Sequence, residues 1–297
     1  MIALRFGEPE RVAASRLIGI AIEEDLAEGS DLTSAALIPP EDCAEVHVVA
    51  RQRAVIAGLP IGDLVYGQID RLIGWVPEVG DGTVVEPEDV VARVAGPLAG
   101  LLTGERTVLN FLTHLSGIAT QTHEFVERVQ GTGAVILDTR KTLPGWRRLA
   151  RYAVRAGGGV NHRMGLYDGV LIKDNHIAAW SRQIGNSSLA GAVGQARETA
   201  PGRVIECEVD TIDQLRDVLE GSPDIVLLDN MTVEQIREAT RIRDATAPQV
   251  LLEASGGISL LTVRSIAETG VERISVGALT HTVPNCDLGF DFYSVAK

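Results

Sequence analysis

Lysine is rare in this chain, and its positions point to chemistry. Of the 27 lysine and arginine residues, only Lys141, Lys173 and Lys297 are lysine. An ammonium group is a compact charge with three donors, whereas a guanidinium is a planar fork, so the two are not interchangeable at a binding site. Two solvated surface lysines would also explain the pattern, but Lys141 and Lys173 fall where a catalytic site is expected below.

The segment 139–163 concentrates positive charge in an otherwise acidic chain. It holds seven basic residues and no carboxylate, whereas the whole chain has a net charge of -13. Arg147, Arg151 and Arg155 recur every four residues, which predicts one exposed stripe of a helix that acts as a solvated face or a subunit contact. The flanking loops supply the candidates for anion binding: Arg140, Lys141, His162 and Arg163.

These side chains need a scaffold, and the second half of the chain reads as a series of strand–helix units. Strands are expected at residues 135–138, 169–173, 204–209, 225–229, 250–253 and 273–276, with helices at 211–219, 233–244 and 260–268. Repeated units of this kind predict a parallel sheet, and six in series favour a closed barrel over an open sheet.

The first hundred residues read as a mixed α/β region. A helix is expected over 11–27, strands at 44–50, 84–85 and 90–94, and then a long amphipathic helix with Thr103 as its N-cap. Arg106 would lie in the first turn of that helix, where a cation opposes the helix dipole. A residue that breaks a local rule is a site candidate, although a surface pair with Glu105 explains Arg106 equally well.

Chemistry in α/β barrels gathers at the C-terminal ends of the strands, and both interior lysines are expected there. In chain order the strand ends are Asp138 to Lys141, Lys173, Glu208, Asp229, Ser255 to Gly257 and Val276 to Ala278. Many cations with two carboxylates and no activated nucleophile suit a polyanionic substrate together with a phosphorylated one, and stabilisation of charge without a covalent intermediate.

The two glycine-containing loops predict a phosphate site. Gly256 and Gly257 follow an apolar strand and are expected to open a helix, whose N-terminus attracts phosphate. Beside them, Glu208 and Asp229 would pair with the lysines, or hold Mg²⁺ on a diphosphate or ribose hydroxyls, and these roles are compatible. Alternation along residues 204–208 also points Glu206 inward, where it would support Lys173.

Composition argues against several other classes of protein. No apolar run approaches the ~20 residues of a membrane span, and the acidic charge disfavours nucleic acid and anionic membranes as partners. Three scattered cysteines, Cys43, Cys207 and Cys286, disfavour a disulfide framework or zinc site and favour a cytoplasmic protein. The chain also lacks a P-loop, a dinucleotide-binding glycine motif, a G-x-S-x-G elbow and H-E-x-x-H zinc spacing.

The motifs at residues 104–107, 138–145, 152–154, 157–163, 171–176, 208–210, 228–230, 253–258 and 275–281 resemble the quinolinate phosphoribosyltransferase family. The likeness covers nearly the whole chain in the right order. It implies transfer of a phosphoribosyl group from 5-phosphoribosyl-1-diphosphate (PRPP) to quinolinate with Mg²⁺. Diphosphate and CO₂ would be released, and the product would be nicotinate mononucleotide for NAD biosynthesis.

The resemblance also implies a fold and an assembly. The fold is α/β, with an N-terminal open-faced α/β sandwich (1–112, rejoined by 283–297) and an incomplete parallel α/β barrel (113–282). The assembly is a homodimer or larger homo-oligomer in which Arg106 completes the neighbouring site.

Site roles carried over from the family fall into three groups. The quinolinate carboxylates would be held by Arg106, Thr139, Arg140, Lys141, His162 and Arg163. Ribose, diphosphate and the metal would be handled by the catalytic residues Lys141, Lys173, Glu208 and Asp229, with Glu208 and Asp229 as metal ligands. The 5-phosphate would be held by Ser255, Gly256, Gly257, Val276, Gly277, Ala278 and His281.

The chain departs from the family pattern at four places, and three rival functions are weighed against the family's activity. Leu143, Trp146, Ala150-Arg151 and a slightly long segment at 180–188 put loop shape and the dimer contact in question. The first rival is a paralogue of the molybdenum-transport-associated type with another substrate. The others are a silent phosphate- or nucleotide-sensing barrel and an enzyme of the indole-glycerol-phosphate type.

Overall fold

The computed structural model describes residues 4–185 and 188–296, which form two compact units. The N-terminal unit comprises Met1–His123, Lys141–Gly158 and Ala278–Lys297, and the parallel-sheet unit comprises Glu124–Arg140 and Gly159–Gly277. This division differs from the expected one chiefly at Lys141–Gly158, which carries helix α5 (Arg147–Ala156) and packs with the N-terminal unit.

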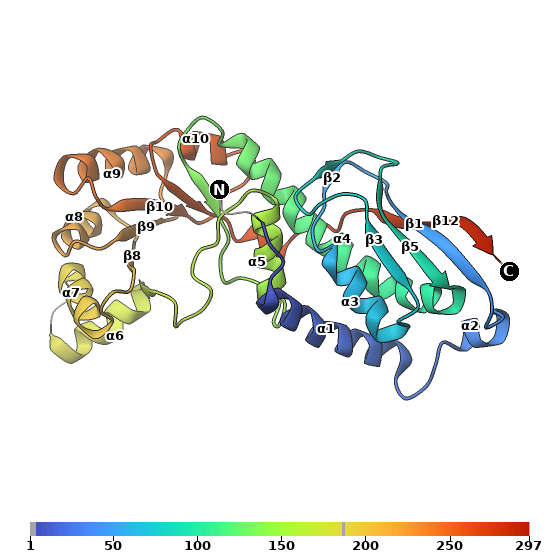
Figure 1. Ribbon diagram of the computed structural model, residues 1–297. Helices are drawn as coiled ribbons and strands as arrows, with labels where there is room; N and C mark the ends of the chain where they lie inside the picture. Colours follow the sequence, from blue (N-terminus) through green and yellow to red (C-terminus); the bar gives the residue numbers. More distant parts are fainter. Residues whose placement is uncertain (1–3, 186–187, 297) are drawn as a thin grey trace. The chain divides into compact units, whose positions relative to one another are not determined.

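An antiparallel sheet in the order β12-β1-β5-β3 organises the N-terminal unit. Its strands are β1 (Cys43–Ala50), β3 (Gly74–Pro77), β5 (Val90–Pro97) and β12 (Leu288–Ala296), and β2 (Ala54–Val55) pairs with β4 (Val84–Val85) in a second small sheet. The end of the chain thus returns to the first strand, and Figure 1 shows the red β12 beside the blue β1. Val46 and Val48 of β1 are buried.

Helices of this unit are α1 (Glu8–Leu26), α2 (Leu32–Leu37), α3 (Pro60–Ile69), α5 and α11 (Ala278–His281), and α4 (Leu98–Arg128) runs on into the other unit. Local capping explains the start of α2, where Asp31 accepts the N–H groups of Thr33 and Ser34 at 3.0 Å. At the N-cap of α5, Trp146 stacks on Phe111 and meets the edge of His114, so this departure from the family pattern serves packing.

The long helix α4 begins five residues before its expected cap. It starts at Leu98, directly after Pro97 ends β5, and the hydroxyl of Thr103 donates to the carbonyl of Ala99 inside the helix. The prediction that Thr103 is an N-cap is therefore wrong. Arg106 is exposed in the third turn, where the helix dipole gives no argument for or against a cation.

The expected arginine stripe on α5 is also wrong. Arg151 is only 1% exposed, because its helix packs between other parts of the N-terminal unit. Arg155 is exposed and pairs with Glu10 of α1 at 3.2 Å, and Nε of Arg147 donates to Thr142. A periodicity of four locates one helix face, but it does not say whether that face meets solvent.

Six parallel strands form the second sheet, in the order β6-β11-β10-β9-β8-β7. Their bounds are β6 (Val135–Leu137), β7 (Val170–Ile172), β8 (Ile205–Val209), β9 (Ile225–Asp229), β10 (Leu251–Ser255) and β11 (Arg273–Ser275). All six expected strands are confirmed to within two residues at each end. Since β6 and β7 are edge strands that do not pair in the described residues, the closed barrel expected from the repeat count alone is wrong.

The crossover helices are α6 (Asp174–Ile184), α7 (Leu189–Thr199), α8 (Ile212–Glu220), α9 (Val233–Thr246) and α10 (Val263–Ala267). Thr211 and Thr232 start α8 and α9 with capping boxes. In the segment 180–188, residues 180–184 are helical and residues 186–187 lie outside the described part. Among the described helices, none has the length and apolar character needed to cross a membrane.

Candidate active site

The parallel sheet gathers most of the expected site residues at one edge, because parallel strands all end on the same side. Register places Asp229 of β9 opposite Ser255 of β10, and Val276 after β11 donates its N–H to Leu137 of β6. The residues at these ends are Thr139, Arg140, Lys173, Glu208, Asp229, Ser255, Gly256, Gly257, Val276 and Gly277. Four expected site residues belong instead to the N-terminal unit: Arg106, Lys141, Ala278 and His281.

Arg140 and Arg163 place two positive charges near each other. Nη1 of Arg163 donates to the carbonyl of Gly169 at 2.9 Å, which fixes its side chain. Burial and the charge of Arg140 both lower the pKa of Arg163, while Glu206 acts in the opposite direction. Two cations that repel each other are stabilised by an anion between them, so this pair can bind a carboxylate.

The loop that carries His162 and Arg163 is tied to the end of β6. Val160 forms a parallel bridge with Leu137, and the fully buried Asp138 accepts both the N–H of His162 at 2.9 Å and Nδ2 of Asn161 at 2.6 Å. This anchoring positions the loop without a helix or strand of its own.

Lys173 and Glu208 form an ion pair between the ends of β7 and β8. Nζ of Lys173 contacts Oε2 of Glu208, whose side chain is 11% exposed. Lys173 also occupies the N-cap position of α6, where its N–H donates to Nδ1 of His176 at 3.0 Å. Pairing of Glu208 with a lysine is confirmed, whereas the expected support of Lys173 by Glu206 is wrong, because Glu206 contacts His162.

The glycine loop after β10 lies tightly against the end of β9. Asn230 adopts a left-handed backbone (φ 53°), donates its N–H to the carbonyl of Ser255 and its Nδ2 to Asp229. A Cβ on Gly256 would lie 2.2 Å from Oδ1 of Asn230, so only glycine fits. The prediction that the glycines open a helix is wrong, since α10 begins at Val263, and any phosphate held here would meet N–H groups of the loop.

A buried charged cluster under this edge was not identified from the sequence. Nε2 of His162 lies 3.1 Å from Oε2 of Glu206 and 3.2 Å from Oε1 of Glu253, and Nε of Arg273 donates to Oε2 of Glu253 at 2.8 Å. Burial raises the pKa of Glu206, whereas His162 and Arg273 outweigh burial at Glu253 and lower its pKa. The feature of the sequence that could have revealed this cluster is Glu253, a charged residue inside the otherwise apolar run 251–254.

The relatives of this chain are identified by comparing its sequence with models of known protein families. The model of the C-terminal domain of quinolinate phosphoribosyl transferase matches residues 118–291, and that of its N-terminal domain matches residues 31–116. The chain belongs to the quinolinate phosphoribosyltransferase family. The resemblance of the motifs is thereby confirmed.

Curated relatives and solved structures of the family agree. A carboxylating nicotinate-nucleotide pyrophosphorylase from Mycobacterium leprae is 45% identical over 94% of this chain and 97% of its own, and a probable one from Bacillus subtilis is 41% identical over 90% and 89%. The structure of the nicotinate-nucleotide pyrophosphorylase from Francisella tularensis superposes with a TM-score of 0.86 at 37% identity, covering 95% of this chain and 96% of that one. The expected α/β fold class is confirmed.

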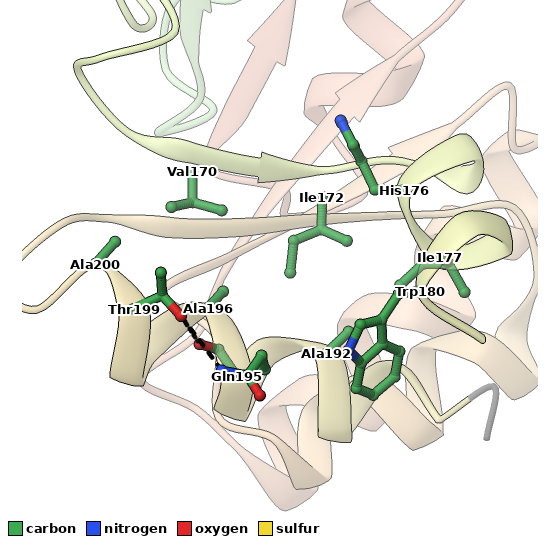
Figure 2. Close-up of a pocket in the computed structure, with 10 residues that line it drawn as sticks. All are labelled: Val170, Ile172, His176, Ile177, Trp180, Ala192, Gln195, Ala196, Thr199 and Ala200. Carbon is green, nitrogen blue, oxygen red and sulfur yellow. Dashed lines mark hydrogen bonds between the residues drawn. The ribbon is translucent and has the colours of Figure 1, made fainter. Parts of the chain in front are cut away.

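A separate apolar cavity of about 310 Å³ lies between β7, α6 and α7. Figure 2 shows Val170 and Ile172 of β7 facing helix α7, with Trp180 of α6 at one end of the cavity. Two of its polar lining residues, Gln195 and Thr199, are hydrogen-bonded to each other at 3.3 Å, and His176 is a third. The family's phosphorylated and acidic ligands are polyanions, so this apolar lining does not suit them.

Proposed function

We propose that this chain transfers the phosphoribosyl group of PRPP to quinolinate and releases diphosphate and CO₂, which yields nicotinate mononucleotide for NAD biosynthesis. The observation that carries the proposal is the match of both domain models of the family across residues 31–116 and 118–291. Relatives at 45% and 41% identity, named for the same activity, support it.

Quinolinate would bind at the cationic part of the strand-end edge. The neighbouring guanidinium groups of Arg140 and Arg163 suit its two carboxylates, because planar forks match carboxylate geometry. Thr139 and His162 belong to the same unit as these arginines. Lys141 would hold the carboxylates as well, and Arg106 would come from a partner chain.

PRPP would bind along the opposite part of this edge. The loop Ser255, Gly256 and Gly257 exposes N–H groups for the 5-phosphate, with Val276, Gly277, Ala278 and His281 as further contacts. Glu208 and Asp229, at the ends of adjacent strands, fit Mg²⁺ carried on a diphosphate, because this ion binds one or two carboxylates together with substrate phosphates. When bound, Mg²⁺ would neutralise charge on the leaving diphosphate.

The chemistry needs charge stabilisation and no nucleophilic side chain. Departure of diphosphate leaves oxocarbenium character on the ribose, which Glu208 and Asp229 stabilise, while Lys141 and Lys173 attract the leaving group. The ring nitrogen of quinolinate forms the new bond to the ribose carbon and becomes a pyridinium. The C–CO₂ bond beside the ring nitrogen then breaks, its electron pair stays on that ring carbon, where the adjacent positive nitrogen stabilises it, and a proton replaces the lost group there.

The enzyme would act in the cytoplasm as a homodimer or larger homo-oligomer. Arg106, exposed on α4, would complete the site of a neighbouring chain. The odd number and wide spacing of the cysteines suit a reducing compartment.

A coupled assay with quinolinate, PRPP and Mg²⁺ tests the proposal, with nicotinate as the parallel substrate. We expect nicotinate mononucleotide and CO₂ in equal amounts from quinolinate and no product from nicotinate. A folded protein that binds PRPP but turns over neither acid would reject the proposal in favour of the molybdenum-transport-associated paralogue.

A further inference from the structure

The buried carboxylate pair, Glu206 and Glu253, has no part in the chemistry above. Glu206 is 2% exposed and Glu253 is 0% exposed, yet both face Nε2 of His162 within 3.2 Å. Two adjacent carboxylates without water are strongly unfavourable unless cations or protons neutralise them. A buried charged cluster beneath a binding site is therefore expected to have a function that apolar residues could not perform.

Two basic side chains approach the pair from different directions. Arg273 of β11 holds Oε2 of Glu253, and His162 meets both carboxylates. Burial lowers the pKa of His162, but the nearby carboxylates of Glu206 and Glu253 outweigh this and raise it to about 10. The N–H of Arg163 opposes this rise, because it needs an unprotonated Nδ1 as its acceptor.

A metal ion is the alternative occupant of this cluster. The ligand atoms of His162, Glu206 and Glu253 lie within 4.8 Å of one another, which would suit a cation. Arg273 already pairs with Glu253, however, and a guanidinium next to a metal ligand repels the metal. Charge pairing is therefore favoured.

The imidazole links the buried pair to Arg163. Its Nδ1 accepts the N–H of Arg163 at 2.8 Å, while the N–H of His162 itself is held by Asp138. Both ring nitrogens are thus fixed, one by β8 and β10 and the other by the loop. A shift of the ring would carry Arg163 with it.

We propose that Glu206 and Glu253 are positioning residues that orient the His162 ring and, through it, hold Arg163 at the place where the acid substrate binds. The inference rests on the proposed function, because it assigns Arg163 to the quinolinate part of the site. Neither carboxylate contacts the substrate.

The variant Glu206→Gln tests this, because it removes the charge and keeps the shape. We expect KM for quinolinate to rise by about tenfold or more while KM for PRPP stays within about twofold, which indicates loss of binding at one end of the site. Glu45→Gln is the matched control, since it makes the same change beside another histidine, His47, whose Nε2 lies 3.0 Å from Glu45 in the N-terminal unit. It should leave both KM values unchanged.

Two outcomes would overturn the inference: an unchanged KM for quinolinate with only a lower Tm, or an equal rise in both KM values. Glu253→Gln, which also disturbs Arg273, is measured second.

Nitrogen NMR of the His162 ring gives a readout that needs no turnover. The pKa of His162 should fall in E206Q, and an unchanged ring signal or a divalent metal that copurifies with the wild type and is lost in E206Q would overturn the inference. A ring that responds as expected in a protein without turnover would reject the proposed function alone.

Discussion

Lys173 occupies the N-cap position of α6 and places its ammonium against Glu208 at the end of the neighbouring strand. An arginine would present a wide planar fork where a compact charge is held, so charge alone is not sufficient. We expect Lys173→Arg, and likewise Lys141→Arg, to lower kcat/KM by about a hundredfold, a transition-state loss of roughly 2.7 kcal/mol. Steady-state kinetics with quinolinate and PRPP measure this.

Arg147→Lys is the matched control for the lysine variants. Arg147 bonds Thr142 through Nε at 3.2 Å and has no assigned role in catalysis, so its loss should stay within about threefold. Comparable losses in all three variants would contradict the argument from lysine rarity.

The buried Tyr152 and the half-buried Asp81 form another pair, in the N-terminal unit, where the tyrosine hydroxyl donates to Oδ2 at 2.5 Å. Burial raises the pKa of Asp81, and the bonds from Tyr152 and Leu59 partly offset this. Without the hydroxyl, the ionised carboxylate loses a donor, so Tyr152→Phe should cost about 1–3 kcal/mol of unfolding free energy at pH 7.

The pH dependence of this cost has a definite sign. Because the pKa of Asp81 is raised in the folded state, the contribution of this carboxyl group to stability is complete at low pH and is lost as the pH rises through that pKa. The loss of unfolding free energy caused by Tyr152→Phe should therefore become smaller on acidification to about pH 4, as measured by urea unfolding. The exposed Tyr293→Phe should show no penalty at either pH, and a penalty that grows with acid would refute the assignment.

At the scale of elements, the glycine loop after β10 offers two neighbouring positions with different constraints. A Cβ on Gly256 would collide with Asn230, whereas a Cβ on Gly257 would meet open space and suffer only from the left-handed backbone. Gly256→Ala should raise KM for PRPP by about tenfold or more, because the loop must move to relieve the clash, and Gly257→Ala by much less. Equal effects would show that space at Gly256 is unimportant.

Element boundaries show what the sequence predicts and what it does not. Strand ends such as Asp229 follow from apolar runs that stop at polar turn residues, so the candidates at the sheet edge were predictable. The start of α4 was not, because Pro97 leads from strand to helix without a capping residue and Thr103 imitates a cap. Burial of Arg151 and the contact of Glu206 with His162 depend on tertiary packing, which periodicity does not encode.

At the scale of the whole molecule, a shared site predicts complementation between variants. If Arg106 serves the neighbouring chain, an Arg106→Ala chain paired with a Lys173→Ala chain has one intact site. A mixture of the two inactive proteins, unfolded and refolded together, should recover about a quarter of wild-type activity when dimers form at random. Each variant refolded alone is the control, and no recovery in a confirmed mixed dimer would place Arg106 in its own chain's site.

The pairing of β12 with β1 has a consequence for biosynthesis. Arg51 and Asp291, which pair at the edge of this sheet, are 240 residues apart in the chain. A ribosome adding about 5–20 residues per second needs roughly 10 to 50 s to cover that distance. During this time β1 has an unpaired edge while the parallel-sheet unit is being made, so the nascent chain depends on chaperones or on its own charges to keep that edge from pairing with other chains.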